Sequence, residues 1–138
     1  MHKLDPIFSK YIDTFSRLSI FLAYFWFGII KVTGQSPASP LVIDLQKATL
    51  PFLDSNSFVI FLGLTEVIIG LLYLYKPLTK ITFVLSIAHM ATTFLPLIFL
   101  PNIAWTGFLL PTLEAQYILK NFILVALMVQ VYLNYKKK

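Results

Sequence analysis

Residues 58–75, FVIFLGLTEVIIGLLYLY, form an uninterrupted apolar run with one carboxylate, Glu66, at its centre. A helix of about 20 residues crosses the hydrocarbon core of a bilayer, and this run is close to that length. A carboxylate in hydrocarbon is costly, so it marks a functional site by default, and its partner is expected on another apolar segment. The run therefore predicts a transmembrane helix, and Glu66 is the first candidate for function.

The composition extends this prediction to the whole chain. Of its 138 residues, 58% are hydrophobic and only 12% are charged, which is more apolar surface than a soluble domain of this size can bury. The absence of cysteine excludes disulfide exchange, thiolate catalysis and thiolate metal sites. The net charge of +5 comes from cations at the ends of apolar runs, so we expect no nucleic-acid partner. The length predicts one membrane domain, residues 1–138.

Four apolar segments, at about residues 17–33, 57–75, 78–100 and 112–135, are separated by clusters that stop helices. Residues 34–56 make an external connection with a short helix that ends at Pro51. Residues 1–16 carry apolar side chains at helical spacing and are expected to lie along the membrane surface. We therefore predict an all-α fold, a bundle of four transmembrane helices in a polytopic integral membrane protein.

The cations are distributed unevenly between the two sides of this predicted bundle. One side has only Lys47 clearly outside a span, whereas the side with both termini has Lys3, Lys10, Arg17, Lys76, Lys80, Lys136, Lys137 and Lys138. Cytoplasmic loops carry the excess of lysine and arginine, so the sequence predicts that both termini are cytoplasmic.

Each predicted span carries one polar stripe at helical spacing. Because lipid offers no hydrogen-bond partners, we expect all four stripes to point into the bundle. The stripes are Tyr24, Gly28 and Lys31; Gly63, Glu66, Gly70 and Tyr73; Thr82, Ser86, His89 and Thr93; and Glu114, Gln116, Tyr117, Lys120 and Asn121.

The ionisable members of these stripes lie in the outer half of the bundle, whereas the fourth span is almost entirely apolar from Phe122 onward. This pattern predicts a polar pocket that opens outward above a sealed cytoplasmic floor. Comparable depth pairs Glu66 with Lys120, and Glu114 with Lys31. The ligand pocket is expected to comprise Tyr24, Gly28, Lys31, Gly63, Glu66, Gly70, His89, Thr93, Glu114, Gln116, Tyr117, Lys120 and Asn121.

Each of these features also has a structural interpretation. A buried ion pair binds a ligand or handles protons, or it only fixes helix packing. Gly63 and Gly70 open room for a ligand, or they let two helices approach closely. His89 is a proton relay, or it is held by a neighbouring hydroxyl. The sequence has no local metal-binding or catalytic motif, so we expect no metal site, and the catalytic residues are unknown.

Three segments resemble a known family: YFWFGIIKVTG (24–34), GLTEVIIGLLYL (63–74) and PTLEAQYILKNFILVA (111–126). They are similar to the DoxX-like family of small four-helix membrane proteins, and within it to the YkgB-type branch, over about residues 21–133. The resemblance implies a bacterial inner-membrane location and an association with redox systems, either quinone-linked oxidation of sulfur compounds or defence against oxidative stress. The residues that carry it are Gly28, Lys31, Glu66, Gly70, Glu114, Gln116, Lys120 and Asn121.

The first functional hypothesis is a redox-associated accessory subunit that binds a quinone-like or other small amphipathic molecule. Glu66, His89 and Lys120 would hold or protonate its polar head, with Tyr24 and Phe27 beside it. Its partners would be the lipid bilayer, a membrane or periplasmic redox protein, and further copies of the chain in a homo-oligomer. The alternatives are a structural or interaction subunit that docks a partner enzyme, and a small transporter.

Overall fold

A computed structural model describes residues 6–137 of the chain. Within these residues, four helical segments are long and apolar enough to cross a membrane. They are α1 (Pro6–Val32), α3 (Ser55–Leu74), the segment Lys76–Phe99, and α7 (Leu113–Lys136). The predicted all-α bundle of four transmembrane helices is confirmed.

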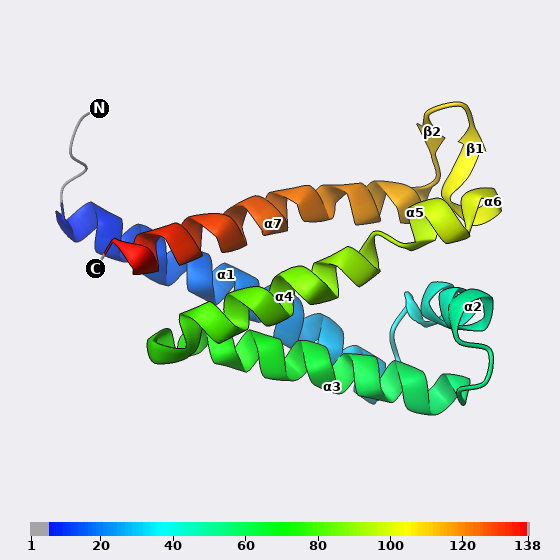
Figure 1. The fold of residues 1–138 in the computed structure, drawn as a ribbon, viewed down its shortest axis with the longest axis horizontal. Helices are drawn as coiled ribbons and strands as arrows, with labels where there is room; N and C mark the ends of the chain where they lie inside the picture. Colours follow the sequence, from blue (N-terminus) through cyan, green and yellow to red (C-terminus); the bar gives the residue numbers. More distant parts are fainter. Residues whose placement is uncertain (1–5, 138) are drawn as a thin grey trace.

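Shorter elements connect the long helices. α2 (Ser39–Thr49) lies between α1 and α3, and the 3-10 helix η1 (Lys76–Leu78) leads into α4 (Thr79–Thr93). α5 (Pro96–Phe99), α6 (Pro101–Ala104) and the antiparallel strands β1 (Trp105–Gly107) and β2 (Leu110–Pro111) precede α7. The start of α1, the turn at η1 and the end of α7 lie at one end of the molecule, and α2 and the β1–β2 hairpin lie at the other (Figure 1). The long helices therefore alternate in direction.

Helices α1 and α3 form the closest seam in the bundle. A Cβ atom placed on Gly28 would lie 2.6 Å from the backbone oxygen of Gly63, and one on Gly70 would lie 3.0 Å from the backbone nitrogen of Phe25. Small residues permit such an approach of two backbones in a membrane. Ile20, Tyr24, Ile69, Tyr73, Met90, Met128 and Val131 form the buried core beside this seam.

The start of α1 differs from the sequence prediction. We expected residues 1–16 on the membrane surface, but one continuous helix begins at Pro6; residues 1–5 lie outside the described part of the chain. Asp13 and Arg17 are buried, and Arg17 Nε donates to Asp13 Oδ2 at 3.2 Å. Arg17 also donates to the carbonyl oxygen of Tyr73 at 3.2 Å. These partners stabilise the first turns of α1 against α3, so the lead is part of the bundle.

The other helix boundaries follow local chemistry. Asp54 caps α3 by accepting from the backbone N–H of Ser57 at 2.8 Å. α4 ends at Thr93 because Pro96 cannot continue the helical hydrogen bonds, so the third predicted span is divided into α4 and α5. The short helix predicted in the external connection is α2, which ends at Thr49 before Pro51.

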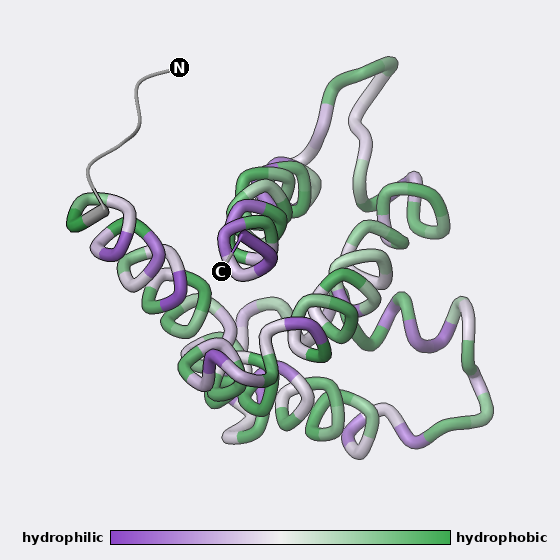
Figure 2. The backbone as a smooth tube through the Cα atoms, turned by 60° about the vertical axis from the view of Figure 1, so that its left-hand side comes forward, coloured by the Kyte–Doolittle hydropathy of each residue, from purple (hydrophilic) through white to green (hydrophobic). Residues whose placement is uncertain are grey.

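Large apolar side chains cover the outside of the bundle. Trp26, Phe61 and Ile123 are 63%, 67% and 75% exposed. Figure 2 shows hydrophobic residues along most of the length of the long helices. Lipid tails solvate such side chains, whereas water would leave a large exposed apolar surface. The exposed surface therefore agrees with a membrane-spanning protein.

Candidate functional site

Four polar side chains from three helices meet inside the bundle, and we call them the core cluster: Tyr24, Lys31, Glu66 and His89. Lys31 Nζ lies 2.7 Å from Glu66 Oε2, and His89 Nε2 lies 3.3 Å from Glu66 Oε1. The other ring nitrogen, His89 Nδ1, lies 3.3 Å from the hydroxyl oxygen of Tyr24. At most 9% of the side chains of Lys31, Glu66 and His89 is exposed. The core cluster is thus a continuous buried chain of side chains at hydrogen-bond distance from one another.

Helical phase brings the core cluster together. Tyr24 and Lys31 are seven residues apart on α1, so they share the face that packs on α3. Glu66 lies between Gly63 and Gly70 on the buried face of α3. His89 is one turn beyond Ser86 on α4, and Ser86 is fully buried. The sequence prediction that these three stripes face inward is confirmed.

Hydroxyl groups continue the polar contacts from the core cluster toward η1. The Tyr24 hydroxyl lies 3.4 Å from the carbonyl oxygen of Ser86, and the Ser86 hydroxyl lies 2.7 Å from that of Tyr73. At the end of the bundle that carries η1, Asp13 accepts from Arg17 and lies 3.7 Å from Lys76 Nζ. Sequence reasoning missed this group of ions because it placed residues 1–16 outside the bundle. The i,i+4 spacing of Asp13 and Arg17 was the available signal.

The polar stripe of α7 does not face the bundle interior. Glu114, Gln116, Tyr117 and Lys120 are exposed, and Asn121 is half-buried. The buried residues of α7 are Ala115, Ile118, Met128 and Val131. Helix α7 turns this apolar face to its neighbours and leaves its polar groups outside.

Both predicted ion pairs were therefore wrong. Glu66 pairs with Lys31 rather than Lys120, and Glu114 has no salt bridge among residues 6–137. The Lys120 ammonium lies 5.0 Å from the centroid of the Tyr117 ring on its own helix. A long lysine near a helix end extends toward the membrane surface, so equal depth does not imply contact.

Other residues predicted for the ligand pocket contribute to helix packing or lie outside the bundle. The space beside Gly28, Gly63 and Gly70 is occupied by backbone and side-chain atoms of the opposing helix. These glycines therefore permit the close α1–α3 seam and leave no room for a ligand there. Thr93 donates to the carbonyl oxygen of His89 on its own helix. Phe27 is 57% exposed on the outside of α1 and does not flank the core cluster.

A cavity of about 580 Å³ opens beside the core cluster, at the end of the bundle that carries α2 (Figure 1); we call it the outer cavity because the sequence predicts that this end lies outside the cytoplasm. Lys31 belongs to both, because it is one of the residues that line the cavity and its ammonium bonds Glu66. Ser39 also lines the cavity, and its hydroxyl is buried without a hydrogen-bond partner in the part of the chain that the structure describes. The remaining lining residues are Val32, Thr33, Gly34, Ile43, Asp54, Ser55, Asn56, Val59 and Ile60.

Charge in the outer cavity is partly balanced. Glu66 neutralises Lys31, and the cavity's carboxylate is Asp54. Hydrogen bonds from Ser57, chiefly from its backbone N–H, hold the pKa of Asp54 below its usual value, so Asp54 is ionised at neutral pH. A free anion is therefore not favoured there.

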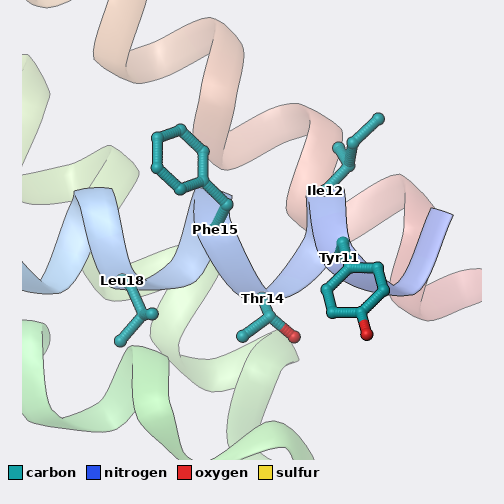
Figure 3. Close-up of a pocket in the computed structure, with 5 residues that line it drawn as sticks. All are labelled: Tyr11, Ile12, Thr14, Phe15 and Leu18. Atoms are coloured by element: carbon teal, nitrogen blue, oxygen red, sulfur yellow. The ribbon is translucent and has the colours of Figure 1, made fainter. Parts of the chain in front are cut away.

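A second hollow, of about 480 Å³, lies on the exposed face of α1 (Figure 3). Tyr11 and Phe15 there are 69% and 73% exposed, and none of the lining residues is charged. Its remaining lining residues are Ile12, Thr14 and Leu18. This surface suits a lipid chain and has no contact with the core cluster.

The core cluster is a set of hydrogen-bonded side chains with two groups that can ligate a metal. Across residues 6–137, no three histidine, aspartate or glutamate side chains come together as metal ligands. The glutamate and histidine of the core cluster provide two such donors, and Lys31 takes one carboxylate oxygen.

Scans against protein-family models, curated proteins and solved structures find no match to this chain.

Proposed function

We propose that this protein is a DoxX-like, redox-associated accessory subunit of the bacterial inner membrane, with both termini in the cytoplasm. It binds the polar head of a quinone-like or other small amphipathic molecule in the outer cavity. The observation that carries the proposal is that Lys31 both lines the cavity and pairs with the buried carboxylate of Glu66. The family resemblance supports the redox association and the membrane.

The cavity chemistry favours a neutral head with carbonyl oxygens. The Lys31 ammonium has three N–H groups, of which one is directed to Glu66. The Ser39 hydroxyl supplies a second donor without a partner in the described chain. The volume of about 580 Å³ falls within the range of small-molecule sites. A quinone ring with two carbonyl acceptors and an apolar tail matches these donors and the bilayer beside them.

Quinone content and quinone binding test this proposal directly. Protein purified from native membranes is extracted and its quinones are identified by mass spectrometry. Short-chain ubiquinone and menaquinone analogues are then titrated into protein reconstituted in nanodiscs. We expect co-purified quinone and saturable binding. Finding neither would overturn the proposal.

Matched variants locate the binding site. Lys31→Met and Ser39→Ala each remove one donor, and Ser39→Ala does so without disturbing the Lys31–Glu66 pair. A lost hydrogen bond to a charged donor weakens affinity about tenfold or more, so Lys31→Met is expected to have the larger effect. Lys120→Met is the control, because Lys120 is exposed on α7 and does not line the cavity. Equal weakening by Lys120→Met would contradict this site.

The alternative of a structural subunit is favoured by the close α1–α3 seam and by the mutual pairing within the core cluster. In that case the polar core only fixes the helices, and function lies in docking a partner enzyme. Affinity purification from native membranes in mild detergent discriminates between the two. A stoichiometric partner on a chain without quinone would favour the structural subunit.

A further inference from the structure

His89 has both ring nitrogens at hydrogen-bond distance from side chains of two other helices. Nε2 faces Glu66 Oε1 on α3, and Nδ1 faces the Tyr24 hydroxyl on α1, each at 3.3 Å. The side chain of His89 is 8% exposed. A ring nitrogen that carries a proton donates a hydrogen bond, and a bare one accepts. The two neighbours therefore decide which protonation states of His89 fit the site.

The Tyr24 hydroxyl has two acceptors within reach. Its oxygen lies 3.3 Å from His89 Nδ1 and 3.4 Å from the carbonyl oxygen of Ser86. One hydroxyl proton can be directed to only one of them at a time. Rotation of a single O–H bond thus switches Tyr24 from donor to acceptor toward His89.

Two complete hydrogen-bond arrangements follow from this geometry. When His89 is neutral, Nε2–H donates to Glu66, and bare Nδ1 accepts from the Tyr24 hydroxyl. When His89 is protonated, Nε2–H still donates to Glu66, Nδ1–H donates to the Tyr24 oxygen, and Tyr24 donates to the carbonyl oxygen of Ser86. Uptake adds one proton at Nδ1, and Tyr24 keeps its own proton. Neither state leaves a ring nitrogen of His89 or the Tyr24 hydroxyl without a hydrogen-bond partner.

Protonation of His89 adds a positive charge beside Glu66, whose carboxylate already balances Lys31, so the protonated cluster carries one net positive charge. On α3 the facing group is the Glu66 carboxylate, and on α1 they are Tyr24 and, behind Glu66, Lys31. Within its own helix the nearest polar side chains are the hydroxyls of Ser86, Thr92 and Thr93. Helix α7 packs on α4 through aromatic contacts, Phe94 with Phe122 and Phe83 with Tyr132. Among the described residues, Glu66 is therefore the only carboxylate in contact with the His89 ring.

We propose that His89 is a reversible proton-binding site in the membrane core, with the Tyr24 hydroxyl as its switch. The site goes beyond the binding of an amphipathic molecule and operates in the protein without one. Lys31 lines the outer cavity and bonds Glu66, and His89 contacts the other oxygen of the same carboxylate. The protonation state of His89 therefore changes the charge beside the carboxylate that pairs with Lys31. Proton uptake and a ligand at Lys31 are thereby coupled through Glu66.

Nitrogen NMR of the histidine rings tests this site without any added quinone. The full chain is labelled with ¹⁵N-histidine and reconstituted in nanodiscs, and His2→Asn separates the signals of the two histidines. Spectra are recorded from about pH 4 to about pH 9. We expect neutral His89 to carry its proton on Nε2, and Nδ1 to change reversibly from bare to protonated as the pH falls.

Tyr24→Phe removes the switch and keeps the ring. The titration midpoint of His89 is expected to shift by about one pH unit or more, because both states lose their partner at Nδ1 and the protonated state loses the stronger, charge-assisted hydrogen bond. Tyr135→Phe, at an exposed position near the end of α7, is the control and leaves the midpoint unchanged. A single protonation state over the whole range, or a neutral ring protonated on Nδ1, would overturn the proposal. So would a Tyr24→Phe midpoint equal to that of the unmodified chain. Should Tyr24→Phe not fold, the tautomer and titration of the unmodified chain decide the question.

Discussion

Lys31 Nζ lies 2.7 Å from Glu66 Oε2, across the seam between α1 and α3. Both side chains are more than nine-tenths buried, and the second carboxylate oxygen of Glu66 faces His89. Three transmembrane helices therefore meet at one carboxylate. The stability of the bundle, the proposed ligand site and the proposed proton-binding site all involve this group.

Glu66→Gln is expected to destabilise the protein strongly. The substitution leaves the Lys31 ammonium buried without a counter-ion, and breaking such a pair costs about 3–5 kcal/mol. The measurement is the thermal unfolding midpoint in detergent, compared with Glu114→Gln. Glu114 is exposed, so its variant should stay within about 0.5 kcal/mol of the unmodified chain. Equal midpoints for the two variants would contradict the pairing.

A double variant distinguishes the cost of the unpaired Lys31 ammonium from the other effects of replacing Glu66. Lys31→Met combined with Glu66→Gln removes both charges, so it should be more stable than Glu66→Gln alone. If Glu66→Gln and the double variant are equally unstable, the loss arises from something other than the unpaired ammonium.

Gly28→Ala is expected to open the α1–α3 seam. The added methyl would lie 2.6 Å from the carbonyl oxygen of Gly63 and 2.8 Å from Val67, and backbone atoms cannot yield as a flexible side chain does. Overpacking of this kind costs about 1–3 kcal/mol, measured as a lower unfolding midpoint. Gly107→Ala is the control, since its methyl would meet the end of the Leu110 side chain at 3.1 Å. A Gly28→Ala chain as stable as Gly107→Ala would show that the seam is loose.

The cap at Asp54 is expected to weaken in acid. Its folded-state pKa is lowered by hydrogen bonds from Ser57, so its stabilisation is present above the pKa of the unfolded chain. The stabilisation is lost as the pH falls through the lower folded-state pKa. Asp54→Ala should therefore unfold earlier than the unmodified chain at neutral pH, and the difference in midpoint should shrink below about pH 4. A constant difference would exclude ionised Asp54 as its source.

The orientation of the chain can be tested because it has no cysteine of its own. Phe108→Cys places a thiol in the exposed β1–β2 hairpin, and Lys80→Cys places one at the opposite end of the bundle. A membrane-impermeant maleimide should label Phe108→Cys in cells with a permeabilised outer membrane. It should label Lys80→Cys only after the inner membrane is also disrupted. The reverse pattern would place both termini outside the cytoplasm.

Three of the four polar stripes were predictable because helical phase and the absence of hydrogen-bond partners in lipid act on each helix alone. Tyr24, Glu66 and Ser86 are buried as their phase predicts. The same argument failed for α7, because the ends of a transmembrane helix reach the membrane surface. Polar groups such as Glu114 need no partner there.

The sequence by itself determined that the protein is an all-α membrane bundle, since apolar length and helical periodicity are local properties. Only the tertiary structure decided which charges meet. The Gly28–Gly63 contact draws α1 against α3 and brings Lys31, rather than Lys120, to Glu66. The tertiary structure also showed that Asp13 and Arg17 belong to the bundle. The rotation and spacing of two packed helices depend on both surfaces at once, so neither sequence segment alone specifies them.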